Sequence, residues 1–106
     1  MNTEQILSQA NQAAIEAENN FLAKHGEPMY CGCAWVTVFV DRTNSTEAKQ
    51  LLDLGFRTSH VRKCLTSGNV GGYKGQSLDV AEAGADAYAE VLRNYGFRAY
   101  SKSYAT

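Results

Sequence analysis

The chain has 106 residues, of which 44% are hydrophobic, and a formal net charge of −1 at pH 7. This composition excludes an intrinsically disordered chain, and the balanced charge argues against a dedicated nucleic-acid-binding protein, which normally carries a strong basic excess. No apolar run is long enough to cross a bilayer. We therefore expect one domain spanning residues 1–106, with no membrane partner and without nucleic acid as a principal partner.

The cysteine content indicates a reducing compartment. Cys31, Cys33 and Cys64 are an odd number of thiols, so a complete set of disulfides within one chain is impossible. The residues from Met1 to Gln5 also lack the basic start and apolar centre of a signal peptide. We predict a cytoplasmic location.

A first helix is predicted from Thr3 to His25, because apolar residues recur there at three- and four-residue spacing. Thr3 is a suitable N-cap and Gly26 a suitable stop. The apolar stripe is formed by Ile6, Leu7, Ala10, Ala13, Ala14, Ala17, Phe21 and Leu22. The stripe packs either on this domain's own sheet or against a second subunit.

The segment from Cys31 to Val40 predicts a strand with two largely apolar faces. One face carries Gly32, Ala34, Val36, Val38 and Val40, and the other carries Cys31, Cys33, Trp35, Thr37 and Phe39. Such a strand is expected at the centre of a sheet, covered on both sides. A small monomer has too little chain to cover both faces, so we expect a homodimer or higher homo-oligomer.

A short second helix is predicted to end at Leu54, with Asn44 or Ser45 as its cap. Its inward residues are Ala48, Leu51 and Leu52. A second strand is expected from about Phe56 to Thr66. Basic residues interrupt its apolar pattern, which suits a sheet edge or the wall of a wet pocket.

The last helix is predicted from Val80 to Tyr95, with Asp79 as N-cap and Glu82 completing a capping box. Gly84 is expected to permit close contact between this helix and the sheet. A final strand follows from Phe97 to Ser101. The prediction is an α+β domain with a three-stranded sheet packed with helices, in the order α-β-α-β-α-β, with the strand directions left open.

A glycine-rich loop precedes the last helix and leaves backbone N–H groups accessible to an anion or polar ligand. Its spacing matches neither a Walker loop nor a dinucleotide fingerprint. Together with the basic strand it predicts a site for a nucleotide-type small molecule, formed by Arg57, His60, Arg62, Lys63, Tyr73, Lys74, Gln76, Ser77 and Asp79. The alternative is that Gln76, Ser77 and Asp79 only shape a turn and cap the helix, while the basic residues are solvated.

Other chemistry is less well supported by the sequence. Cys31, Cys33, Cys64 and His60 are zinc-type ligands, but no CxxC pair exists, and His60 and Cys64 lie about 13 Å apart on an extended strand. No triad-like arrangement accompanies the cysteines. We expect no catalytic residue, no metal and no cofactor.

Three motifs resemble a family of small uncharacterised proteins of tailed-phage genomes. They are C-G-x-A-W-V at Cys31–Val36, G-Q-S-x-D at Gly75–Asp79 with G-A-x-A-Y-x-x-V-L at Gly84–Leu92, and G-F-x-A-Y-x-x-S at Gly96–Ser103. Relatives carry an aromatic residue where Cys33 stands, and Arg and Asp where Tyr104 and Thr106 stand. Neither a metal site at the cysteines nor a C-terminal charge pair is therefore implied.

The resemblance motivates the hypothesis of a phage accessory protein that counters host defence in the host cytoplasm. With the anion-accepting loop, it suggests non-enzymatic sequestration of a nucleotide-derived signal. The rival hypothesis is a protein–protein inhibitor of a host or defence enzyme, acting through an aromatic patch around Tyr95, Tyr100 and Tyr104. Single-stranded nucleic-acid binding is a third hypothesis, and it predicts affinity that falls steeply with salt.

Overall fold

In the computed structural model, residues 2–27, 30–41, 45–59, 63–68, 70–71, 73, 75 and 77–105 are described. The elements are α1 (Thr3–His25), β1 (Gly32–Phe39), α2 (Thr46–Asp53), β2 (Arg57–Thr58), β3 (Cys64–Gly68), α3 (Leu78–Asn94) and β4 (Arg98–Ala105). The sheet is 4-stranded in the order β2-β3-β1-β4, and every pairing is antiparallel. The α+β class is confirmed, whereas the prediction of three strands is wrong.

The additional strand arises because the segment predicted as one strand from Phe56 to Thr66 forms a hairpin. Thr58 pairs with Leu65, the Ser59 N–H donates to the Cys64 carbonyl at 3.0 Å, and Lys63 has a positive φ of 57°. A residue with positive φ belongs to a turn and not to a continuous strand. The element order is therefore α-β-α-β-β-α-β.

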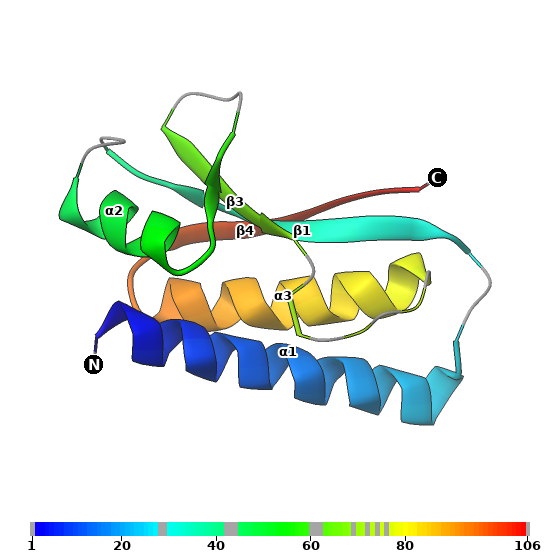
Figure 1. Cartoon of the computed structure of the whole chain (residues 1–106). Helices are drawn as coiled ribbons and strands as arrows, with labels where there is room; N and C mark the ends of the chain where they lie inside the picture. The colour runs from blue at the N-terminus through cyan, green and yellow to red at the C-terminus, as the bar shows by residue number, and fades with distance from the viewer. Residues whose placement is uncertain are drawn as a thin grey trace.

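The helices cover one face of the sheet. Figure 1 shows α1 and α3 side by side and antiparallel beneath the strands, with α2 near the end where α1 begins. Val36 and Val38 of β1, Leu65 of β3 and Ala99 of β4 point toward the helices and are fully buried. They pack with apolar residues of all three helices in one core: Ile6, Leu7, Ala10, Ala14, Ala48, Leu51, Ala85, Tyr88, Ala89 and Leu92.

The opposite side of the sheet carries the alternate residues of each strand. We call this the open face, because no described helix covers it. It consists of Cys33, Trp35, Thr37 and Phe39 of β1, Cys64 and Thr66 of β3, Arg57 of β2, and Arg98, Tyr100, Lys102 and Tyr104 of β4, which the strand registers place opposite one another. The central position of β1 is confirmed. No described helix packs on its second face, although Thr37 there is buried among its neighbours, and the homo-oligomer stays a prediction.

Local hydrogen bonds decide where α1 and α2 begin. α1 is capped by Asn2, whose side chain accepts from the Gln5 N–H at 2.8 Å while Gln5 reaches back in a capping box. Thr3, predicted as the cap, is instead the first helical residue. For α2 the cap is Ser45, as predicted, because its hydroxyl accepts from the Ala48 N–H at 3.2 Å.

The start of α3 differs from the prediction. Its N-cap is Ser77, and Asp79 lies in the first turn, where a carboxylate is favoured by the helix dipole. A bridge between Cys31 and Ser77 and a 2.8 Å bond from the Leu78 N–H to the Tyr30 carbonyl fix the chain there. These tertiary contacts start the helix two residues earlier than its sequence pattern indicates.

Candidate functional site

The most unusual polar group of the described chain is Glu18. It lies on the stripe of α1 that faces α3, one turn after the fully buried Ala14, and only 4% of its surface is exposed. A carboxylate is rarely buried to this extent without a partner cation. Among the described residues, the one ion pair joins Arg98 to Asp41, so Glu18 has no such partner there.

Two glycines make the space for this side chain. A Cβ added at Gly84 of α3 would lie 2.8 Å from Glu18 Cγ, and one added at Gly71 would lie 2.7 Å from Glu18 Cδ. Both distances are shorter than real contacts of this kind, so a larger residue at either position would displace Glu18. Gly84 was expected to bring α3 close to the sheet, and this expectation is wrong because it admits a side chain of α1.

The segment around Gly71 is fixed against α1. Gly71 has a φ of 88°, which favours glycine, and its N–H donates to the Asn11 side-chain oxygen at 2.9 Å. Burial raises the pKa of the Glu18 carboxyl above its ordinary value, and a hydrogen bond from the Tyr73 backbone opposes this rise in pKa. The carboxyl group is thus held between two backbone segments.

Tyr73 forms a second polar contact beside Glu18. Its hydroxyl donates to Glu27 Oε2 and accepts from the Ser77 N–H at 3.0 Å. Burial and the neighbouring Glu27 both raise the pKa of the Tyr73 hydroxyl. The Ser77 hydroxyl is buried and has no hydrogen-bond partner among the described residues. The end of α1, the glycine-rich segment and the start of α3 are joined by these bonds.

A small cavity of about 70 Å³ opens at this junction. We call it the Glu18 pocket. Four parts of the chain line it: α1, the start of β1, the segment before α3, and the first turn of α3. The lining residues are Glu18, Gly32, Cys33, Ala34, Val70, Tyr73, Gly75 and Ala81. Carboxylate and hydroxyl oxygens meet small apolar groups here. Such a lining suits a flat group that donates hydrogen bonds.

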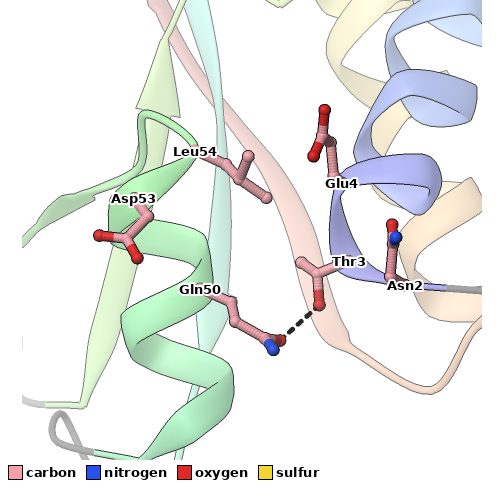
Figure 2. A pocket seen from close by; sticks show the side chains of 6 residues that line it. All are labelled: Asn2, Thr3, Glu4, Gln50, Asp53 and Leu54. Carbon is pink, nitrogen blue, oxygen red and sulfur yellow. Dashed lines mark hydrogen bonds between the residues drawn. The ribbon is translucent and has the colours of Figure 1, made fainter.

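A larger hollow of about 250 Å³ lies between the start of α1 and the end of α2 (Figure 2). Thr3 and Gln50 are joined across it by a hydrogen bond of 2.7 Å. Its other lining residues are Asn2, Glu4, Asp53 and Leu54, and none of the six is buried. A ligand there would meet solvated side chains, so we consider the Glu18 pocket the stronger candidate.

The structure brings together only part of the site predicted from the sequence. Tyr73 lines the Glu18 pocket, and the Ser77 N–H donates a hydrogen bond to the Tyr73 hydroxyl. Asp79 lies in the first turn of α3. The predicted residues His60, Arg62, Lys74 and Gln76 lie outside the described residues.

The two described basic residues of the predicted site lie elsewhere. The Lys63 carbonyl accepts from the Val40 N–H after the end of β1, whereas Ser77 bridges Cys31 before its start. The eight residues of β1 therefore separate Lys63 from Ser77, by about 25 Å at the usual rise per residue of a strand. Arg57 lies on the outer strand β2 and is exposed. The structure therefore does not join these cations to the glycine-rich segment.

Glu18 was missed by the sequence analysis, although a signal was present. It follows Ala10 and Ala14 at four-residue spacing, so it interrupts the apolar stripe at a position that must face the core. A charged residue on a buried stripe indicates a polar site. The nearby Gly84 on the last helix is the second half of that signal.

Other chemistry is limited within the described residues. No disulfide joins Cys31, Cys33 and Cys64 in the described chain, and no group of three described His, Cys, Asp or Glu side chains is arranged to hold a metal ion. No helix in the described part of the chain is long and apolar enough to cross a membrane.

Comparisons with known proteins find no match for this chain among protein-family models, curated proteins or solved structures.

Proposed function

We propose that the chain is a non-enzymatic binding protein for a nucleotide-derived molecule. The base of this ligand would enter the Glu18 pocket edge first. The observation that carries this proposal is a carboxyl group, 4% exposed, on the wall of a cavity with no partner cation among the described residues. A buried charge without a partner costs free energy, and a ligand with suitable donors offsets that cost.

Guanine fits this wall better than a phosphate does. Its ring N–H and its amino group are two parallel donors, which an ionised carboxylate accepts together. A phosphate group would instead meet Glu18 and the nearby Glu27, which bonds to Tyr73. The phosphates of the ligand would therefore point out of the pocket, and the guanine edge would point in.

The biological role in this proposal follows from the resemblance to tailed-phage proteins. The protein would counter host defence in the reducing cytoplasm of the host by withholding a nucleotide signal without breaking a bond. Cys31 and Cys33 are exposed and form no disulfide within the described chain, which suits such a compartment.

A thermal-shift panel tests the proposal with guanine-containing cyclic dinucleotides, GMP and ADP-ribose. We expect the guanine ligands to raise the melting temperature of the natural protein, and ADP-ribose to have little effect. The Glu18→Gln variant should lose the shift because one of its two acceptor oxygens is gone. Glu16→Gln, an exposed position on the same helix, should keep it. Equal shifts in both variants, or none with any guanine ligand, would reject the pocket as the binding site.

One observation favours the rival hypothesis of a protein–protein inhibitor. Tyr95, Tyr100 and Tyr104 are 41%, 48% and 56% exposed, but Tyr95 bonds to Gln9 on the helical side while the other two share the open face. If the chain is such an inhibitor, a pull-down with this protein as bait would recover a host protein in stoichiometric amount. Substitution of Tyr100 or Tyr104 would abolish that capture. Substitution of Tyr100, which pairs with Thr37 outside the lining of the Glu18 pocket, would leave binding at that pocket unchanged.

A further inference from the structure

We infer that the open face binds single-stranded nucleic acid, independently of the Glu18 pocket. Three features of the described residues support this inference: exposed aromatic rings, basic residues that alternate with them, and acidic residues that belong mostly to the helices. A basic surface with exposed rings is the chemistry that recognises an unpaired strand, whose phosphates are anionic and whose bases stack.

The aromatic residues lie in two adjacent strands at the centre and edge of the sheet. Trp35 and Tyr104 form an edge-to-face pair with centroids 5.6 Å apart, and Phe39 and Tyr100 form another at 6.0 Å. The two tyrosines remain about half exposed, at 48% and 56%. The inner ring of each pair holds the outer ring in place, so the exposed tyrosine surfaces are already arranged for stacking with bases.

Cations alternate with these rings along β4. Arg98 and Lys102 occupy the positions on either side of Tyr100, and Arg57 of β2 lies on the same face at the other edge. Arg93, at the end of α3, places its guanidinium 6.0 Å from the Tyr100 ring centre. The phosphates of a strand running across the sheet would meet these cations while its bases meet the rings.

Most acidic residues belong to the helices. Apart from Glu27 and Asp41, every Asp and Glu of the chain belongs to α1, α2 or α3. Asp41 is ion-paired with Arg98 at 2.7 Å. The near-neutral net charge of the sequence is therefore the sum of a basic sheet face and an acidic helical side, whose charges cancel. This segregation is why composition alone argued against nucleic acid.

The same charges argue against a second copy of the chain as the occupant of the open face. In a two-fold symmetric pair the same patch is present on both subunits. Arg57 and Lys102 would then meet their own copies with few acidic partners, and like charges across an interface are unfavourable. A polyanion gains from these charges instead.

Fluorescence anisotropy with labelled single-stranded DNA and RNA of about 20 nucleotides tests the inference. We expect binding to weaken about 20-fold when salt rises from about 50 to about 200 mM, since three phosphate contacts give a slope near −2. Double-stranded DNA of the same length should bind more weakly, because its bases cannot stack on Tyr100 and Tyr104.

Matched variants separate the open face from general effects. Lys102→Glu should weaken binding about tenfold or more, while Lys49→Glu, the same charge change on exposed α2, should have an effect of less than about twofold. Tyr104→Ala should also weaken binding about tenfold, since one stacked base is lost. Tyr95→Ala, an exposed tyrosine on the helical side, should not. Circular dichroism confirms that each variant is folded.

Three results would overturn the inference. The first is no binding of either single strand at low salt by the folded natural protein. The second is an equal loss in Lys102→Glu and Lys49→Glu. The third is a homodimer in sedimentation that Tyr104→Ala dissociates, because the open face would then be occupied by a second copy.

Discussion

Gly84→Ala is the substitution that most directly tests how Glu18 is held. In an ordinary helix this change stabilises a protein by about 1 kcal/mol. Here the new Cβ would lie 2.8 Å from Glu18 Cγ. The Glu18 side chain cannot move away from it, because Gly71 packs against the other side of the carboxyl group. Overpacking costs about 1–3 kcal/mol, and disturbing the bond from the Tyr73 backbone to a charged group costs about 1.5–3 kcal/mol. We expect a net destabilisation of about 2 kcal/mol, since the helix gain offsets part of this cost.

A double-mutant cycle measured by urea unfolding isolates the contact. In the Glu18→Ala background the side chain is gone, so Gly84→Ala should stabilise by about 1 kcal/mol, which gives a coupling of about 3 kcal/mol. In the Glu18→Gln background the side chain keeps its size, so the loss should remain. The reasoning is refuted if Gly84→Ala stabilises the natural protein, or if its effect is the same in all three backgrounds.

Further predictions concern the pH dependence and two hydrogen bonds. Burial raises the pKa of Glu18 above its ordinary value of 4.5, so its contribution to stability is present below that value and is lost as pH rises through the folded-state pKa. Glu18→Gln should therefore gain stability relative to the natural protein as pH increases, and a constant difference in unfolding free energy would contradict this. Tyr73→Phe should cost about 1 kcal/mol and speed hydrogen exchange of the Ser77 amide, which donates to the Tyr73 hydroxyl; unchanged exchange would show that this bond is not formed. Ser45→Ala should lower stability by about 1 kcal/mol through loss of the α2 cap, and Ser45→Asp should restore it; equal losses in the two variants would argue against capping.

Elements with a clear hydrophobic period were predictable from the sequence. The alternation from Cys31 to Val40 gave β1 and the division of its residues between two faces, and the spacing of apolar residues gave α1 with its end at Gly26. Both patterns are local, since each depends on which side of one element faces the core. The start of α3 was missed because Leu78 is fixed by the distant Tyr30 carbonyl and not by its own helix.

The candidate site and the open face depend on contacts between distant segments. Glu18 and Gly84 meet only because α1 and α3 run antiparallel, and the sequence left the arrangement of elements open. Arg57 and Lys102 share a face only through the registers of β2, β3, β1 and β4. The basic residues were expected to face the glycine-rich segment, because the hairpin that carries Arg57 to the sheet edge was read as one strand.

The most direct test of the Glu18 pocket is isothermal titration calorimetry with GMP and IMP, which differ only in the amino group of guanine. Loss of that donor to a buried carboxylate should weaken binding of IMP about 10- to 100-fold relative to GMP. GMP binding should also strengthen as pH rises through the raised pKa of Glu18, because the ionised carboxyl group is the acceptor. Equal affinities for GMP and IMP in the natural protein would contradict the proposal that Glu18 reads the edge of a base.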